Sequence, residues 1–143
     1  MTVFSRDLGR LRDPQHAQAS RIAVEGSDME ELERNLRELE QAEVVAFGGV
    51  GFAGEVLSVT RAFDAVADEC GPALRPRLER LLDRGSAAGR VYAAFLLARC
   101  DRQAGRDAWQ RLAGDRSPVE TFTGCVKNRT TIAEYAAAQH EPA

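Results

Sequence analysis

The residues of this chain that most resemble a chemical site are the glycines of segment 49–54. An apolar run at residues 44–47 precedes the sequence GVGFAG, and apolar residues at helical spacing follow it. A strand, a G-x-G-x-x-G turn and a helix in that order are typical of dinucleotide-binding folds. Such a fold also needs a second strand about twenty residues further on, ending in an acidic residue for the ribose, and here that distance falls inside an expected helix. We therefore interpret the segment as a tight turn that suits glycine, and keep a small nucleotide-binding enzyme as the alternative.

Histidine and carboxylate side chains form no catalytic or metal-binding pattern in the sequence. His16 and His140, the only histidines, lie near opposite ends of the chain, and neither stands beside a nucleophile with an orienting acid. No HxxxH, HExxH or CxxC spacing occurs, which argues against a transition-metal site. We therefore expect no catalytic residue, no metal and no cofactor, so the chain is expected not to be an enzyme.

The cysteines and the distribution of apolar residues bear on the compartment. Cys70, Cys100 and Cys125 are odd in number and far apart, a pattern that favours free thiols in a reducing compartment over a disulfide scaffold. No run approaches the ~18 apolar residues of a membrane span, and the first thirteen residues include five charged ones, Arg6, Asp7, Arg10, Arg12 and Asp13, where a signal peptide would need an apolar stretch. These features predict a cytoplasmic protein without membrane contact.

Charge is divided unevenly along the chain. Residues 25–43 contain eight acidic residues against two arginines, whereas residues 71–116 contain ten arginines against five acidic residues. Such asymmetry can steer a charged partner. The arginine-rich segment has little aromatic interleaving and its arginines recur one turn from Glu79, Asp83 or Asp107, so nucleic-acid binding is disfavoured. A nucleic-acid adaptor that uses the arginine face remains a further alternative.

Helix-capping patterns predict most of the elements. Asp13-Pro14 opens a helix to about residue 24, and a capping box at residues 27–30 opens a helix to about residue 42 with an apolar stripe at Met29, Leu32, Leu36 and Leu39. Helical spacing follows in residues 56–67 and 74–84, Ser86 can cap an almost wholly apolar central helix, and Asp101 can cap the next, which ends near Gly114. The expected core contains six large residues that each lie on an apolar stripe, namely Leu36, Leu78, Leu82, Phe95, Leu97 and Leu112.

Two more capping boxes frame the C-terminal part of the chain. Residues 117–120 combine Ser, Pro at the first helical position and Glu, and residues 131–134 open a last helix. Between them, residues 121–130 are compatible with a short β-hairpin or with a loop, and the sequence does not decide between the two. Residues 139–143 are expected to form a frayed tail.

A shift of the sequence by about thirty residues aligns Cys70 with Cys100 and Leu82 with Leu112. Repeats of this length built from antiparallel helix pairs are typical of α-solenoids. Residues 86–97 contain an A-x-R-x-x-A-A-x-x-L pattern that resembles the core of short HEAT-like repeats, and the resemblance covers residues 72–120. It implies one all-α domain over residues 1–143, a HEAT-like stack of six or seven short helices, with the repeat-like part at about 55–139.

The function that follows is protein binding. The abundant arginine and alanine are typical of a GC-rich bacterial genome, and the whole pattern is similar to small helical immunity proteins encoded beside antibacterial toxins. That resemblance implies a cognate protein toxin as partner and inhibition by occlusion of its active site. The residues expected to contact the partner are the acids of the first confident helix, a tryptophan at a helix flank, and the polar segment 123–130: Glu30, Glu31, Glu38, Trp109, Lys127, Asn128 and Arg129.

Overall fold

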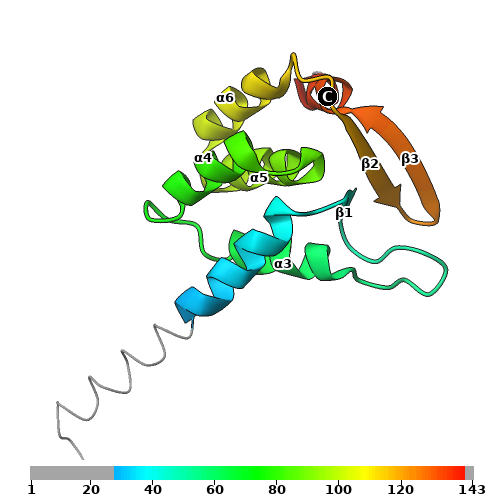
Figure 1. Ribbon diagram of the computed structural model, residues 1–143, viewed down its shortest axis with the longest axis horizontal. Helices are drawn as coiled ribbons and strands as arrows, with labels where there is room; N and C mark the ends of the chain where they lie inside the picture. The colour runs from blue at the N-terminus through cyan, green and yellow to red at the C-terminus, as the bar shows by residue number, and fades with distance from the viewer. Residues whose placement is uncertain (1–27, 141–143) are drawn as a thin grey trace, which may run out of the picture. The chain divides into compact units, whose positions relative to one another are not determined.

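The computed structural model describes residues 28–140 and shows a mostly helical protein with one small sheet (Figure 1). After a helix over residues 28–40, the elements are β1 (Val44–Ala46), α3 (Ser58–Ala67), α4 (Arg75–Arg84), α5 (Ala87–Cys100), α6 (Arg102–Leu112), β2 (Pro118–Thr123), β3 (Val126–Thr131) and α7 (Ile132–His140). The chain divides between Glu33 and Arg34 into two compact units. Residues 28–33 are the described part of the first and are helical, and the following paragraphs concern the second.

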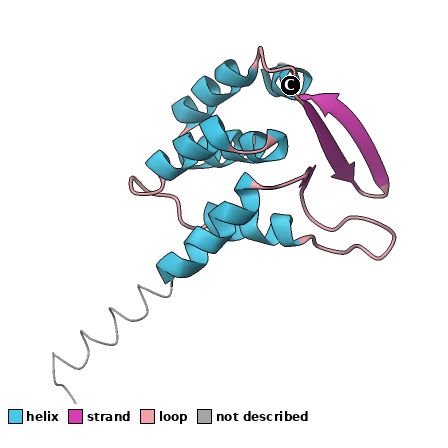
Figure 2. Ribbon diagram, viewed as in Figure 1, coloured by secondary structure: helices cyan, strands magenta, loops and turns pink. Residues whose placement is uncertain are grey.

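The three strands form one sheet in the order β1-β2-β3 (Figure 2). β1 pairs with β2 in parallel, with Val44 opposite Glu120, and β2 pairs with β3 in an antiparallel hairpin, with Glu120 opposite Arg129. The expectation of an all-α fold therefore holds only for the helical majority. The choice left open for residues 121–130 is settled as a hairpin, and the sheet includes a parallel pair that the sequence did not suggest.

The capping box at residues 117–120 was expected to open a helix, and that prediction is wrong. Pro118 begins strand β2, and the residues after it include the β-branched and aromatic types that suit a pleated surface. A proline is tolerated at the first residue of a strand, where its missing N–H breaks no ladder. Instead of capping a helix, Ser117 uses its carbonyl to accept a hydrogen bond from the Ile132 backbone N–H at 3.0 Å.

The other capping predictions within the described residues are confirmed. The Ser86 hydroxyl accepts from the Gly89 backbone N–H at 3.0 Å, and the Asp101 carboxylate accepts from the Gln103 N–H at 3.0 Å. At α7 the Glu134 N–H donates to the Thr131 hydroxyl at 3.1 Å. α7 continues through His140 and so includes the first two residues of the expected tail, which began at residue 139. The expected helix at 14–24, Ser27 and His16 lie outside the described residues.

Helix α5 is the centre of the core, as its apolar composition predicted. Val91, Tyr92 and Leu96 have no exposed surface, and α5 packs against both α4 and α6. Gly105 permits the close approach of α6, because a Cβ there would lie 2.4 Å from Ala98. Of the expected core residues, Phe95 is only partly buried and the other five are buried: Leu36, Leu78, Leu82, Leu97 and Leu112. Met29, expected on the buried stripe, is 67% exposed.

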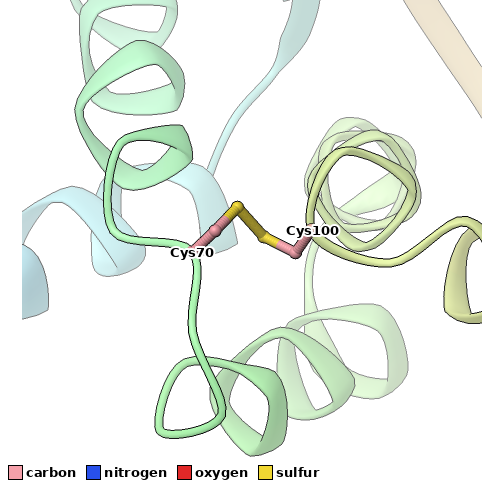
Figure 3. The surroundings of a disulfide bond; sticks show 2 residues. All are labelled: Cys70 and Cys100. Atoms are coloured by element: carbon pink, nitrogen blue, oxygen red, sulfur yellow. A yellow bond between two sulfur atoms is a disulfide. The ribbon is translucent and has the colours of Figure 1, made fainter.

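Cys70 and Cys100 form a disulfide that joins the segment after α3 to the end of α5 (Figure 3). Their Cα atoms lie 5.3 Å apart, within the usual range for a disulfide. The expectation of three free thiols is wrong for this pair, because the count and spacing of cysteines do not reveal which helix ends meet in space. Cys125 is free and exposed. Within residues 28–140, no helix combines the length and the apolar character that a membrane span requires.

Candidate functional site

One face of the sheet forms a groove of about 430 Å³. Its walls are residues 43–44, Leu57, residues 120–122 and residues 127–129. All three strands therefore contribute, together with the residue that precedes α3. We call this feature the sheet groove. It contains Lys127, Asn128 and Arg129, three of the residues that the sequence singled out for partner contact.

The sheet groove combines both charge signs with an apolar base. Because side chains alternate along a strand, Glu120 and Arg129 lie opposite each other on one face, as do Phe122 and Lys127 in the next row. The Lys127 Nζ lies 5.1 Å from the centre of the Phe122 ring, within the range of a cation–π contact. Glu43 adds a second acid at the β1 end, and Val44 and Leu57 add apolar surface. The site can thus contact a partner through charge and through hydrophobic packing at once.

The hydroxyl groups of Tyr92 and Thr60 hydrogen-bond β1, one of the strands that form the groove, to the helical core. The Tyr92 hydroxyl accepts from the Ala46 backbone N–H at 2.7 Å and donates to the Ala46 carbonyl at 3.0 Å, and the Thr60 hydroxyl donates to the same carbonyl at 2.9 Å. Burial raises the pKa of Tyr92 to about 12, although the hydrogen bond to Ala46 acts in the opposite direction. The phenol is therefore neutral and can serve as both donor and acceptor at neutral pH.

A second anchor holds the start of the hairpin. Arg90, on α5, lies 2.6 Å from the Asp115 carboxylate and 3.2 Å from the Ser117 hydroxyl. Burial by itself would raise the pKa of Asp115, but the Ser117 hydrogen bonds and the Arg90 charge outweigh it and lower that pKa. The carboxylate is thereby kept ionised where the chain leaves α6 and enters β2.

Trp109 is not available to a partner in this structure. Its side chain is 6% exposed, its ring centre lies 5.0 Å from that of Phe95, and it stacks on Tyr135 at 6.2 Å. The ring therefore packs α6 against α5 and α7. Trp109, expected at an exposed flank of α6, is one of the buried residues of that helix, because two aromatic neighbours from other segments cover it.

The acidic residues fall into two groups. Glu38 is exposed and accepts a hydrogen bond from the Ser58 hydroxyl, so it is held at the start of α3, next in sequence to the groove residue Leu57. Glu30 and Glu31 are exposed on the helix and belong to the first unit. The structure thus holds Glu38 at the start of α3, although it is not a wall of the groove, and it gives no placement relative to the groove for Glu30 and Glu31.

The glycine segment closes on itself and on the hairpin. The Val50 N–H donates to the Glu55 carbonyl at 2.8 Å, and the Gly51 N–H donates to the Gly124 carbonyl at 2.6 Å. Gly51 has a φ of 75°, in the left-handed region, and a Cβ on Gly49 would lie 2.6 Å from the Gly54 carbonyl oxygen. Helix α3 begins only at Ser58, so the turn does not lead directly into a helix N-terminus. These contacts support the interpretation as a tight turn.

Sequence reasoning missed an apolar tip beside the groove. Phe52, in the glycine segment, is fully exposed, and Val126, at the start of β3, is 56% exposed. The hydrogen bond between Gly51 and Gly124 joins the two segments that carry these side chains. In the sequence, Phe52 occupies a variable position of the G-x-G-x-x-G pattern and carries no signal of its own. Its full exposure in the structure is what marks it as a candidate contact residue.

The arginine-rich face is partly neutralised. Arg75 lies 3.1 Å from Asp101, Arg111 lies 3.1 Å from Glu79, and Arg111 also pairs with Asp83. The two pairs of Arg111 link α6 to α4, which are not adjacent in sequence. Exposed pairs of this kind add little stability, but they leave less positive charge for a phosphate backbone.

A second cavity, of about 380 Å³, lies beside the disulfide. Its lining includes Pro72, Leu78, Leu97 and Cys100, and its charged members Arg75 and Asp101 are paired with each other. Among the residues that the structure describes, no three histidine, cysteine or acidic side chains gather where they could hold a metal ion. No protein-family model, curated protein or solved structure matches this chain.

Proposed function

We propose that this protein is a non-catalytic binding module for another protein, and that the sheet groove is its contact surface. The observation that supports this most is the composition of the groove: Glu43 and Glu120, Lys127 and Arg129, and the Phe122 ring share one surface. Charged rims steer and orient a protein partner, whereas apolar and aromatic centres supply affinity. The exposed Phe52 and Val126 add apolar surface at the hairpin end of the sheet.

The groove suits a protein surface better than the two alternatives. The groove is open along all three strands and carries both charge signs beside an aromatic ring, which suits the surface of a protein partner. The glycine turn makes its hydrogen bonds to Glu55 and Gly124 rather than leading into a helix, which weakens the nucleotide alternative. The ion pairs of Arg75 and Arg111 weaken the nucleic-acid alternative.

Within this class, an immunity protein that occludes the active site of a cognate toxin is the specific form that we favour. The likeness of helices α4 to α6 to a short HEAT-like stack is part of this proposal, with the helices as the rigid base and the sheet as the presented surface. The exposed acids Glu30, Glu31 and Glu38 would face basic groups of the toxin. The expectation of a cytoplasmic protein rested partly on free thiols, and the disulfide removes that part of the argument.

Charge reversal with a matched control tests the proposal. The double variant Lys127→Glu/Arg129→Glu changes the groove, and Arg102→Glu/Arg106→Glu makes the same change in charge at two exposed positions of α6 outside it. Each purified variant and the parent would be used to isolate partners from the source cell, with circular dichroism to verify folding. We expect one protein to be retained by the parent and by the α6 variant but not by the groove variant.

The same protein, expressed without this chain, is expected to be toxic to the cell, and co-expression of the parent is expected to remove that toxicity. Retention of the protein by the groove variant at parental level would contradict the proposed surface. Recovery of nucleic acid alone, or loss of binding only in the α6 variant, would favour the adaptor alternative instead.

A further inference from the structure

Strand β3 is an open edge of the sheet. The strand order is β1-β2-β3, so β3 pairs on one side, and Figure 2 shows no helix or strand of the described residues along its outer side. Val126, Lys127, Asn128 and Arg129 are exposed. An edge strand of this kind presents backbone groups on which a further strand can pair.

The hydrogen-bond pattern identifies which backbone groups face outward. In an antiparallel pair, residues that exchange hydrogen bonds alternate with residues that do not. The bond from the Ile132 N–H to the Ser117 carbonyl fixes the alternation, which makes Thr130, Asn128 and Val126 the residues bonded to β2. The N–H and C=O groups of Lys127 and Arg129 therefore point away from β2, toward the open side. The basic side chains and the free backbone groups belong to the same two residues.

Charge argues against a second copy of this chain as the occupant of the edge. An antiparallel pairing of two β3 strands centred on Asn128 would place Lys127 opposite Arg129 twice, and a parallel pairing in register would place like residues opposite each other. Like charges directly opposite each other on neighbouring strands are destabilising. Pairing of two β3 strands is therefore disfavoured, and an added strand that carries acidic residues is favoured.

The charge pattern on β2 indicates what an added strand would carry. Arg129 has Glu120 opposite it on β2, and Lys127 has the Phe122 ring on its inner side. Within residues 28–140, no strand pairs with either residue on the outer side. An acidic residue opposite Arg129 would complete a row in which a cation lies between two carboxylates. At the hairpin end, the exposed Val126 and Phe52 would contact an apolar residue of the same segment.

We propose that β3 binds an extended segment of the partner protein as a fourth strand, and that this segment carries acidic residues at alternate positions opposite Lys127 and Arg129, with an apolar residue at its Val126 end. This inference rests on the proposed function in that the partner is a protein. It specifies how that partner is held: backbone hydrogen bonds provide the pairing, and the alternate acids select the sequence.

Blocked synthetic hexapeptides test the pairing directly. The probe is Val-Glu-Val-Glu-Val-Thr, and its charge control replaces both glutamates by lysine. Two further peptides carry N-methyl groups, one on the glutamate amides and the other on the second and third valine amides, so that equal numbers of donors are removed on opposite edges of the peptide. Binding to the parent chain, with its disulfide intact, would be followed by the backbone amide NMR signals of Lys127 and Arg129.

We expect the acidic peptide to bind and the lysine peptide not to bind. One N-methylated peptide should lose about tenfold or more in affinity and the other should lose little, since only one edge of the added strand faces β3. Loss in the glutamate-methylated peptide indicates antiparallel addition, and loss in the valine-methylated peptide indicates parallel addition. Lys127→Glu/Arg129→Glu should reverse the preference in favour of the lysine peptide, and Arg102→Glu/Arg106→Glu should not.

Equal affinity of the two N-methylated peptides, or no saturable shift of the two amide signals up to millimolar peptide, would overturn the strand addition. Dimerisation of the parent through β3 would overturn the choice of occupant. If the isolated partner protein binds through the groove while the N-methylated peptides are equivalent, only this inference fails. If the peptides behave as expected but no partner protein is retained by the parent, the proposed function fails instead.

Discussion

At the residue scale, the Tyr92 hydroxyl links the end of β1 to the buried centre of α5. It is both acceptor and donor for the peptide of Ala46, the last residue of β1, and it lies in a fully buried environment. Removing it leaves the Ala46 N–H without its partner, and a buried unsatisfied donor costs about 1–3 kcal/mol.

We therefore expect Tyr92→Phe to lower the free energy of unfolding by about 1–3 kcal/mol, measured by urea denaturation. Tyr135→Phe is the matched control, because it removes the same atom from a ring that stacks on Trp109 without fastening β1. Equal effects of the two substitutions would contradict the anchoring role of Tyr92.

The same tyrosine makes stability depend on alkaline pH. Its pKa is raised from 10.0 to about 12 in the folded protein, chiefly by burial. The unfolded chain therefore releases this proton first, so the contribution of Tyr92 is complete below pH 10 and is lost as the pH rises toward 12. We expect the urea midpoint of the parent to fall across this window. In Tyr92→Phe the fall should be smaller, and an identical fall in both proteins would contradict the assignment to Tyr92.

At the element scale, the disulfide connects two segments that the helices alone would leave separate. It joins Cys70, after α3, to Cys100, at the end of α5, across a sequence separation of 30. Closing a loop of that length restricts the unfolded chain by about 3–4 kcal/mol in the chain-entropy description. The bond also forms part of the wall of the second cavity, because Cys100 lines it.

We expect Cys70→Ser/Cys100→Ser to lower the free energy of unfolding by about 3–4 kcal/mol under oxidising conditions. A reducing agent should lower the melting temperature of the parent but not that of the double variant. Cys125→Ser removes the free, exposed cysteine and should leave stability unchanged. A parent that is insensitive to reduction would show that the bond contributes nothing to stability.

At the scale of the whole molecule, the uneven charge distribution should govern how fast a partner arrives. The net charge is −3, but acids dominate residues 25–43 and arginines dominate residues 71–116. Rim charges act mainly on the association rate, and salt screens them. Side chains at the centre of an interface act mainly on dissociation.

We expect Glu30→Lys/Glu31→Lys/Glu38→Lys to slow association with the partner about tenfold at low salt and to reduce the salt dependence of that rate, while dissociation changes little. Surface plasmon resonance at several salt concentrations measures both rates. Glu38→Lys alone separates the acid that lies beside α3 from the two in the first unit. An unchanged rate in the triple variant would show that the acidic residues do not guide the encounter.

The sequence by itself determined the features that depend on residues close together in the chain. The caps at Ser86, Asp101 and Thr131 use partners two or three positions away, so their hydrogen bonds could be predicted without the fold. The buried centre of α5 followed from its apolar composition. The tight turn at Gly51 could also be predicted, because glycine adopts positive φ values without steric cost.

Only the tertiary structure decided the features that join distant segments. The capping-box sequence at residues 117–120 became part of a strand, in which Glu120 pairs with Val44. Phe95 and Tyr135 pack on Trp109, so this candidate contact residue is buried. Cys70 and Cys100 come together only when the segment after α3 lies beside the end of α5. Local preference for helix or strand is worth only tenths of a kcal/mol per residue, so long-range packing overrides it. For the same reason the sheet groove, whose residues come from three separate parts of the chain, exists only once the chain has folded.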